Sequence, residues 1–340
     1  MKFSEKALRF FLRMGARVFY GDGSQVDWIF EKIRRPRTAW LAARNMLNFK
    51  LRVPRLAGLI TVGIEPVFGC NLRCAYCWGR FEPTLSGKRE KLMSWELFTS
   101  VIDQLPASVE TVTFGSVGEP LLHPRLIDMI EYAASKGRRV AMYTNGTLLH
   151  GEKAEQLARS PLSVLNVSME PTEETARDFR GIDYGQVRKN IQAFSGMRRP
   201  GMDLQLSVVI HPGNQTLVER VHEEWRGIVD RVKVAPMIEL NVQSCGVRES
   251  CSEIWRGNMN IQTNGVVSPC CLDVEGELAI GNLNKQPLRE ILDGGVFQDM
   301  MRGFCRGKVP PRCMRCTEYG GKGVPLKIPK LGKRTDRKPL

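Results

Sequence analysis

Three cysteines stand close together near residue 70. Cys70, Cys74 and Cys77 are separated by three and then by two residues in the stretch CNLRCAYC. Thiolates are soft ligands that suit zinc or an iron–sulfur cluster. A structural zinc site is closed by four ligands, whereas a cubane cluster held by three cysteines keeps one iron open for a substrate or cofactor. The spacing therefore predicts a cluster with one open coordination position.

The composition argues against a disulfide scaffold. The chain has 340 residues, of which 42% are hydrophobic and 25% charged, the profile of a globular protein. No apolar run reaches the about 18 residues of a membrane span, and the first residues do not have the pattern of a secretory signal. Disulfide scaffolds are short and secreted. We therefore interpret the clustered cysteines as metal ligands.

Positive charge is concentrated at the two ends of the chain. Residues 1–60 hold 13 Lys/Arg against 4 Asp/Glu, residues 301–340 hold 12 against 2, and residues 61–300 hold 25 against 30. Basic ends favour an anionic partner such as a membrane surface, a phosphorylated substrate or nucleic acid. A solvated tail is the simpler explanation for residues 322–340. Residues 3–19 carry an apolar stripe beside a basic one, which is typical of an interfacial helix but also of a helix packed on the domain.

From residue 60 the sequence alternates between strands and helices, after a basic helix predicted over 38–50. The predicted strands cover 59–68, 109–118, 138–146, 162–170, 203–214 and 231–238, with helices at 94–105, 124–137, 151–160, 184–194 and 216–228. Six strands separated by helices imply an α/β fold with a parallel sheet and right-handed crossovers. A partial barrel fits this count, and its chemistry is expected at the C-terminal ends of the strands. After Asn241 the pattern breaks into short Gly-rich segments that hold seven of the ten cysteines.

The stretch CNLRCAYC resembles the signature of radical S-adenosylmethionine (SAM) enzymes. In that family three cysteines, with an aromatic residue before the last, follow the first strand of a partial (β/α)6 barrel. The resemblance covers about residues 60–320. It implies that Cys70, Cys74 and Cys77 hold a [4Fe-4S] cluster whose open iron binds SAM. One electron then cleaves SAM to a 5′-deoxyadenosyl radical, which abstracts a hydrogen atom from a substrate C–H bond, while the protein orients the cofactor and excludes water.

The resemblance also implies SAM contacts at the ends of the strands. Gly118, Glu119 and Pro120 match a Gly-Gly-Glu-Pro loop whose backbone and carboxylate receive the SAM amino group, although Val117 replaces its first glycine. The other expected contacts are Tyr76 beside the ligand, Thr144 and Asn145 after the third strand, Ser168 and Glu170 at the ribose or carboxylate, and Val209 and Ile210 over the adenine. Two of these have plainer explanations, because an Asn-Gly pair is often only a turn and a glutamate before proline can cap a helix.

A second cysteine set resembles the auxiliary-cluster extension called SPASM, in its shortened Twitch form. Its members are Cys251, Cys270, Cys313 and Cys316, and no cysteine follows the last of them. The resemblance implies one auxiliary [4Fe-4S] cluster with four cysteine ligands and no open iron, which suits electron transfer. A zinc site built from the same four residues is the alternative. Of the remaining cysteines, Cys271 is expected to be buried packing, Cys305 is an alternative ligand, and Cys245 has no assigned role.

These features predict four segments. Residues 1–58 form a basic helical extension, 59–240 the radical SAM partial barrel, 241–321 a small C-terminal Twitch-type cluster domain, and 322–340 a basic tail. The expected protein is cytoplasmic, with peripheral contact at the inner face of the membrane through residues 1–20. Nothing in the sequence selects a general base.

The predicted activity is a radical SAM oxidoreductase in which the auxiliary cluster accepts an electron from the substrate radical. Dehydrogenation or bond formation on a small, phosphorylated or lipid-linked substrate is expected, with a one-electron donor such as flavodoxin or ferredoxin. Maturation of a ribosomal peptide by cross-linking or epimerisation is the alternative, although the roughly 60 residues before the barrel are short for a precursor-binding domain. An iron–sulfur electron carrier is the non-enzymatic alternative. RNA modification is disfavoured because no RNA-binding motif accompanies the basic tail.

Overall fold

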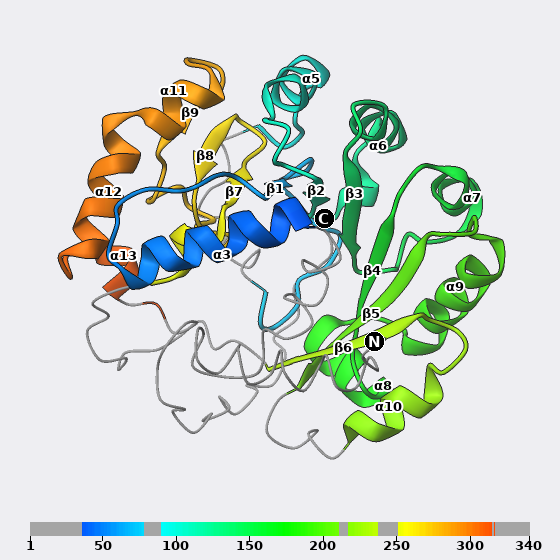
Figure 1. Cartoon of the computed structure of the whole chain (residues 1–340). Coiled ribbons are helices and arrows are strands. Elements are labelled where there is room, and N and C mark those ends of the chain that lie inside the picture. The colour runs from blue at the N-terminus through cyan, green and yellow to red at the C-terminus, as the bar shows by residue number, and fades with distance from the viewer. Residues whose placement is uncertain (1–35, 78–89, 211–216, 237–250, 315, 317–340) are drawn as a thin grey trace, which may run out of the picture.

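The fold is a single curved sheet with helices around its outer face (Figure 1). The computed structural model describes residues 36–77, 90–210, 217–236, 251–314 and 316. Nine strands pair in the order β6-β5-β4-β3-β2-β1-β7-β8-β9. They are β1 (Thr61–Ile64), β2 (Thr111–Phe114), β3 (Arg139–Thr144), β4 (Val164–Met169), β5 (Asp203–Ile210), β6 (Arg231–Pro236), β7 (Asn258–Ile261), β8 (Val266–Ser268) and β9 (Gly281–Asn282).

The helices follow the strands in the predicted alternation. They are α3 (Pro36–Lys50), α5 (Trp95–Gln104), α6 (Leu126–Ser135), α7 (Gly151–Arg159), α8 (Glu173–Thr175), α9 (Tyr184–Met197), α10 (Val218–Glu224), α11 (Leu288–Asp293), α12 (Gly295–Cys305) and α13 (Pro311–Met314). Three short turns, η2 (Pro120–Leu122), η3 (Ala176–Arg180, a π-helical turn) and η5 (Glu253–Arg256), complete the described elements. Ser94 caps α5 as a serine at this position should, since its hydroxyl accepts from the Leu97 N–H at 3.1 Å.

The six predicted strands are confirmed as parallel neighbours from β1 to β6. The sheet, however, continues past β1. Strand β7 pairs with β1 in parallel, with Thr61 opposite Asn258, and β8 and β9 follow in antiparallel order. The region after Asn241 therefore adds three strands to the same sheet. Their shortness explains why the sequence did not predict them, because two to four residues carry little periodicity.

The two faces of the central strands differ in chemistry. On the outer face, Val62, Ile64, Val112 and Phe114 are buried in the main hydrophobic core beneath the helices. The alternate residues of β1, β2 and β7 face the inside and are only half-buried. Closed barrels fill this space with branched apolar side chains. Here the inward residues are mostly small or polar, which leaves an interior able to hold a ligand.

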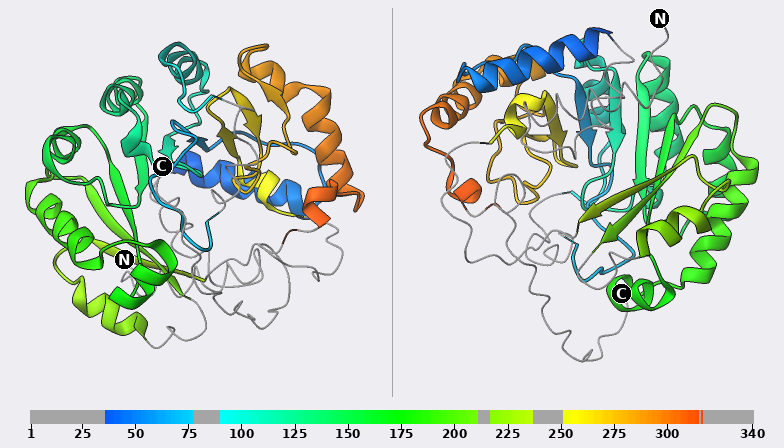
Figure 2. Two further views of the ribbon diagram at one scale, coloured as in Figure 1. Left: turned by 180° about the vertical axis from the view of Figure 1, so that it is seen from behind. Right: turned by 60° about the horizontal axis from the view of Figure 1, so that its bottom comes forward.

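Helix α3 packs at the N-terminal ends of β1 and β7. Its Asn45 side chain donates to the Gly58 carbonyl at 2.9 Å and accepts from the Ala57 N–H at 2.6 Å. The Phe49 and Trp255 rings lie 5.5 Å apart. Figure 2 shows α11 and α12 at the β7–β9 end of the sheet and α9 and α10 at the opposite end. None of the helices within the described ranges is long and apolar enough to cross a membrane.

Candidate active site

The cysteine loop is fixed to the loop after β2 by a close backbone approach. The Glu119 N–H donates to the Gly69 carbonyl at 2.9 Å. A Cβ at position 118 would lie 1.9 Å from the Val67 carbonyl oxygen, so only glycine fits there. Gly118 thus lets the Gly-Glu-Pro loop lie directly against the residues that precede Cys70.

Glu119 joins the ends of β2 and β3. Its carboxylate accepts from the Thr144 hydroxyl at 2.7 Å, the Asn145 N–H at 2.8 Å and the Leu121 N–H at 3.1 Å. The side chain is almost fully buried, and this burial raises its pKa while the three hydrogen bonds act in the opposite direction. The predicted residues Glu119, Thr144 and Asn145 therefore form one group, in which the carboxylate positions the two neighbours.

The same group reaches the first cysteine. Asn145 Nδ2 lies 3.6 Å from Cys70 Sγ and 2.9 Å from Asn71 Oδ1, and the Leu72 N–H lies 3.4 Å from Cys70 Sγ. Hydrogen bonds to a cysteine sulfur stabilise its thiolate and tune the potential of a bound cluster. The Asn145–Gly146 turn is therefore also part of the environment of Cys70.

A second buried group surrounds Tyr76. The Tyr76 hydroxyl donates to Glu170 Oε1, which also accepts from Arg180 Nε at 2.9 Å. The Arg180 guanidinium lies 5.5 Å from the centre of the Tyr76 ring. The Ala75 N–H donates to the Phe179 carbonyl at 2.7 Å, which fixes the cysteine loop to η3 after β4. Tyr76 is thus held by its hydroxyl as well as by its ring.

Arg180 was missed by the sequence analysis. Its side chain is 7% exposed and its partner Glu170 is 0% exposed, so the ion pair is buried. Burial raises the pKa of the Cys74 thiol to about 12, and the charge of Arg180 opposes this increase. In the sequence Arg180 is one basic residue in a run of charges, and only the π-helical turn directs it back to the cysteine loop.

The three cysteines fit a multi-iron cluster. They share one short loop, and each thiol influences the charge of its neighbours, since Cys70 and Cys77 both raise the pKa of Cys74. Burial raises the pKa of Cys70 to about 11, so metal binding must displace protons from these thiols. Among the described residues no three His, Cys, Asp or Glu side chains gather closely enough for a single metal ion. Cys70, Cys74 and Cys77 would instead hold a cluster of several irons, which would supply the electron for SAM cleavage.

The second cysteine set lies around β8 and α13. Arg312 donates to the Leu272 carbonyl at 2.7 Å, and its Nε lies 3.9 Å from Asp273 Oδ1. This arginine ties the Cys313 segment to the loop that follows Cys270. The Cys316 N–H donates to the Cys313 carbonyl at 3.2 Å, as in a tight Cys-x-x-Cys turn. The arrangement suits a cluster assembled between two loops, with Cys251 entering from the start of η5.

The leftover cysteines differ from one another. Cys271 was expected to be buried packing, and that expectation is wrong, because its side chain is exposed and lines a cavity beside Cys270. Cys270 and Cys271 both line this cavity, and Cys270 is the less exposed of the two. Cys305 ends α12, and its carbonyl accepts from Arg52 at 3.3 Å. Cys245 lies outside the described residues.

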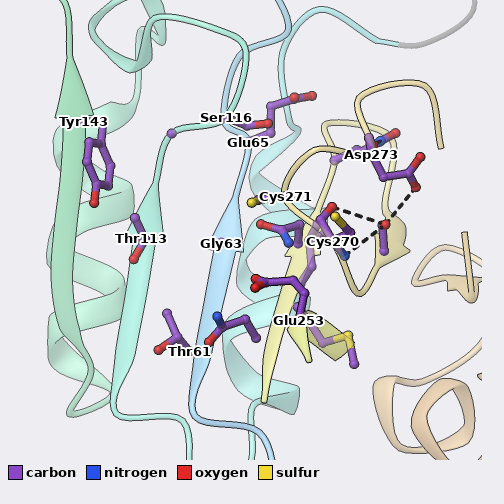
Figure 3. Close-up of a pocket in the computed structure, with 17 residues that line it drawn as sticks. Thr61, Gly63, Glu65, Thr113, Ser116, Tyr143, Glu253, Cys270, Cys271 and Asp273 are labelled. Carbon is purple, nitrogen blue, oxygen red and sulfur yellow. Dashed lines mark hydrogen bonds between the residues drawn. The ribbon is translucent and has the colours of Figure 1, made fainter. Parts of the chain in front are cut away.

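The cavity occupies the inner face of β1, β2 and β7 and has a volume of about 340 Å³. Figure 3 shows Gly63 at its centre, with Thr113 on one side and the Cys270–Asp273 loop on the other. A Cβ at Gly63 would lie 2.6 Å from Asn260 Oδ1, so glycine makes room for that amide. Ser116 lines the rim with φ of 110°, a conformation that non-glycine residues rarely adopt and that is often found at functional sites.

The remaining predicted SAM contacts lie at the same end of the sheet. Ser168 is half-buried on β4 and pairs with Ser207 of β5. Val209 and Ile210 end β5, and only the side chain of Val209 is within the described part. Val117, which departs from the family pattern, is buried against Phe68 and Val274. The substitution therefore packs the cysteine loop against the region that carries the second cysteine set.

Family comparisons agree with this geometry. Residues 64–222 match the Radical SAM superfamily, and residues 251–317 match the SPASM iron–sulfur cluster-binding domain. Residues 64–222 are therefore a radical SAM domain, and residues 251–317 that follow it are a SPASM-type domain. These two domains imply [4Fe-4S] clusters and SAM as cofactors.

Individual relatives match over part of their length. Fe-coproporphyrin III synthase of Methanosarcina barkeri is 30% identical over 145 residues, which are 43% of this chain and 35% of that protein. AdoMet-dependent heme synthase of the same organism is 28% identical over 164 residues, 47% of this chain and 45% of that protein. PqqA peptide cyclase of Streptomyces rochei is 28% identical over 152 residues, 44% of this chain and 40% of that protein. The matched segments thus span less than half the length of these curated relatives.

Solved structures share the fold. Streptococcus suis SuiB has a TM-score of 0.59 at 15% identity, over 89% of this chain and 84% of SuiB. The anSMEcpe structure with bound AdoMet has a TM-score of 0.57 at 16% identity, over 77% of this chain and 92% of anSMEcpe. At these identities the likeness establishes the architecture and leaves the substrate open.

Proposed function

We propose that this enzyme oxidises a small polar substrate held in the cavity between its two cysteine sets. The cavity carries this proposal, because it extends along the inner face of β1, the strand that leads into the Cys70 loop, to Cys270 and Cys271. A substrate placed there would lie between the Cys70 loop, which would hold the cluster that starts the reaction, and the second cysteine set, which suits electron transfer. Such an arrangement supports removal of a hydrogen atom from a substrate C–H bond, followed by loss of one electron to a cluster held by the second cysteine set and of one proton to a base or solvent. The net result is a two-electron oxidation by dehydrogenation or bond formation.

The two cysteine sets and the residues around them would have separate roles in the reaction. Cys70, Cys74 and Cys77 would hold the first cluster, and Cys251, Cys270, Cys313 and Cys316 the second. SAM and the first cluster, when bound, supply the radical that abstracts hydrogen from the substrate. Gly118 brings the two loops together, and Glu119 orients the Thr144 hydroxyl and the Asn145 amide beside Cys70. Ser168 and Glu170 at the end of β4 would contribute to the SAM pocket, and Arg180 of η3 would hold the Glu170 carboxylate in place.

The cavity lining favours a neutral or amine-bearing substrate over a phosphorylated one. Glu65, Glu253 and Asp273 are among the residues that line it, and no lysine, arginine or histidine of the described chain is. Two of these carboxylates lie close to an arginine that is not part of the lining. Glu253 pairs with Arg256 at 2.9 Å, and Asp273 lies 3.9 Å from Arg312. No cation among the described lining residues would offset the charge of a phosphate, and placing like charges together costs several kcal/mol.

The substrate class can be tested with a matched pair of probes. Binding of glucosamine and of glucosamine 6-phosphate to the anaerobically reconstituted enzyme is measured by calorimetry. We expect the phosphate to weaken or abolish binding. Tighter binding of the phosphorylated probe would refute this use of the cavity.

Peptide maturation is the second candidate, supported by the names of two relatives, PqqA peptide cyclase and SuiB bound to its precursor peptide SuiA. A cavity of about 340 Å³ has room for one or two side chains of a peptide and not for a folded precursor. In this case the peptide backbone would lie outside the cavity. Crosslinks or mass changes in a peptide encoded beside this protein would favour maturation over small-molecule oxidation.

The radical step is tested by measuring 5′-deoxyadenosine released from SAM under anaerobic reduction. Wild-type protein with full iron content should release it, Cys77→Ser should not, and Cys316→Ser should still release it while losing about half of the iron. The matched pair separates the open site from the closed one. A wild-type protein that carries both clusters and releases no 5′-deoxyadenosine would refute the proposal and favour an electron carrier.

A further inference from the structure

The outer face of α3 exposes large apolar side chains. Trp40 is 56% exposed, Leu47 is 51% exposed and Leu51, just after the helix, is 65% exposed. Exposed apolar residues are ordinary when they are scattered, and informative when they are contiguous. Four of the ten large hydrophobic residues found exposed in the described chain lie between positions 40 and 53, so they are concentrated on this element.

These residues form one stripe. Positions 40, 44, 47 and 51 follow the spacing i, i+4, i+7 and i+11, which places them on one side of a helix with 3.6 residues per turn. The second position is Arg44, whose guanidinium lies 4.7 Å from the centre of the Trp40 ring. The stripe is thus apolar with a cation within it.

The opposite face of the helix is already used. Ala42, Asn45 and Met46 are buried, and Phe49 packs on Trp255. The hydrogen bonds of Asn45 to residues 57 and 58 fix the rotation of the helix against the sheet. The apolar stripe is therefore held on the surface of the molecule by the packing of the other face.

The charge around the stripe has one sign. Helix α3 contains no acidic residue. Arg44, Lys50, Arg52 and Arg55 are all exposed. Tryptophan and leucine beside arginine and lysine are the residues found at the interface of an anionic bilayer, where the rings enter the headgroup region and the cations meet phosphate. Each cation near such a surface contributes about 1 kcal/mol.

We propose that the outer face of α3, formed by Trp40, Arg44, Leu47, Lys50 and Leu51, docks on an anionic lipid surface. The helix packs at the N-terminal ends of β1 and β7, whereas the cysteine loop follows the C-terminal end of β1. Docking therefore leaves the reaction site away from the lipid. The proposal is independent of the reaction the enzyme performs.

The test is co-sedimentation of the full chain with vesicles of phosphatidylcholine alone or mixed with phosphatidylglycerol. We expect binding to the anionic vesicles that weakens as salt is raised. The variant Trp40→Ser/Leu47→Ser/Leu51→Ser should bind at least about tenfold more weakly. Val296→Ser on α12 is the matched control, because this residue is 59% exposed and lies outside the stripe. All variants should release 5′-deoxyadenosine from SAM like the wild type, which shows that they fold.

Three results would overturn the proposal. The first is wild-type protein that sediments no better with anionic than with neutral vesicles. The second is a stripe variant that binds as tightly as the wild type, which would assign lipid binding to another part of the chain such as residues 1–35. The third result would come from light scattering: the wild-type protein is a dimer, the stripe variant is a monomer, and neither binds lipid. In that case the stripe is an interface between two copies of this chain.

Discussion

Replacing Gly118 by alanine tests how the cysteine loop is held. The added Cβ would stand 1.9 Å from the Val67 carbonyl oxygen, 2.8 Å from the Val67 carbonyl carbon and 2.9 Å from the Gly69 carbonyl oxygen. All three atoms belong to the backbone, so no side chain can rotate away. The two loops must separate by about 1.5 Å to restore an ordinary contact with the Val67 carbonyl oxygen.

The expected cost follows from two contributions. Overpacking of a tight contact costs about 1–3 kcal/mol. The separation also stretches the hydrogen bond from the Glu119 N–H to the Gly69 carbonyl, which contributes about 1 kcal/mol. We therefore expect the free energy of unfolding of the metal-free protein to fall by about 2–4 kcal/mol. Cys70 directly follows the displaced backbone, so cluster uptake should fall as well.

Urea unfolding of the metal-free protein and the iron content after anaerobic reconstitution measure the two effects. Gly196→Ala is the matched control, because a Cβ at this position in α9 would meet nothing within 4 Å. Alanine is the better helix former, so the control should be stabilised by up to about 1 kcal/mol. A Gly118→Ala protein with unchanged unfolding and full iron content would refute the account of the two loops.

Three further predictions concern stability. Arg180→Gln leaves the Glu170 carboxylate buried without its guanidinium and should lower the free energy of unfolding by about 3 kcal/mol. Its control, Arg177→Gln at an exposed ion pair, should change the free energy of unfolding by less than about 1 kcal/mol. Equal effects of the two variants in urea titrations would contradict this. Burial lowers the pKa of His123, so below about pH 6.5 the unfolded chain binds the proton before the folded chain does, and the free energy of unfolding falls as the pH falls. His123→Gln should flatten this pH dependence. An unchanged slope in the variant would rule out His123 as its source. Ser94→Ala removes the cap of α5 and should cost about 1 kcal/mol, measured the same way.

The barrel strands were predictable because their periodicity is local. Each of the six parallel strands is a short β-branched or apolar run bounded by turn residues, and the helices between them carry a clear apolar face. The cysteine spacing was equally local, since Cys70, Cys74 and Cys77 lie within eight residues. Strand β7 was not predictable in this way. Its four residues alternate asparagine with apolar residues, and only the pairing of Asn258 with Thr61 gives it a place in the sheet.

The contacts between distant segments were only partly accessible. Glu119 was singled out by its motif, but its bonds to Thr144 and to the Asn145 backbone depend on parallel strands ending at the same level. Arg180 had no motif in the sequence analysis, because its role depends on a turn of π-helix that brings it over Tyr76. Charge and spacing alone do not distinguish it from the exposed Arg177 three residues earlier.

The inner face of the sheet explains why the substrate was the hardest feature to predict. In β1, β2 and β7 the outward residues are buried and the inward ones are half-buried, which in sequence is indistinguishable from an ordinary strand with one side in water. Only the curvature of the sheet turns that side into the wall of a cavity. The sequence pattern therefore predicts that residues such as Thr113 and Asn260 face solvent, although they line the cavity. The polar inward residues contribute little to the apolar core, so the requirements of folding do not determine their identity, and the sequence pattern of the fold gives no indication of the ligand they would contact.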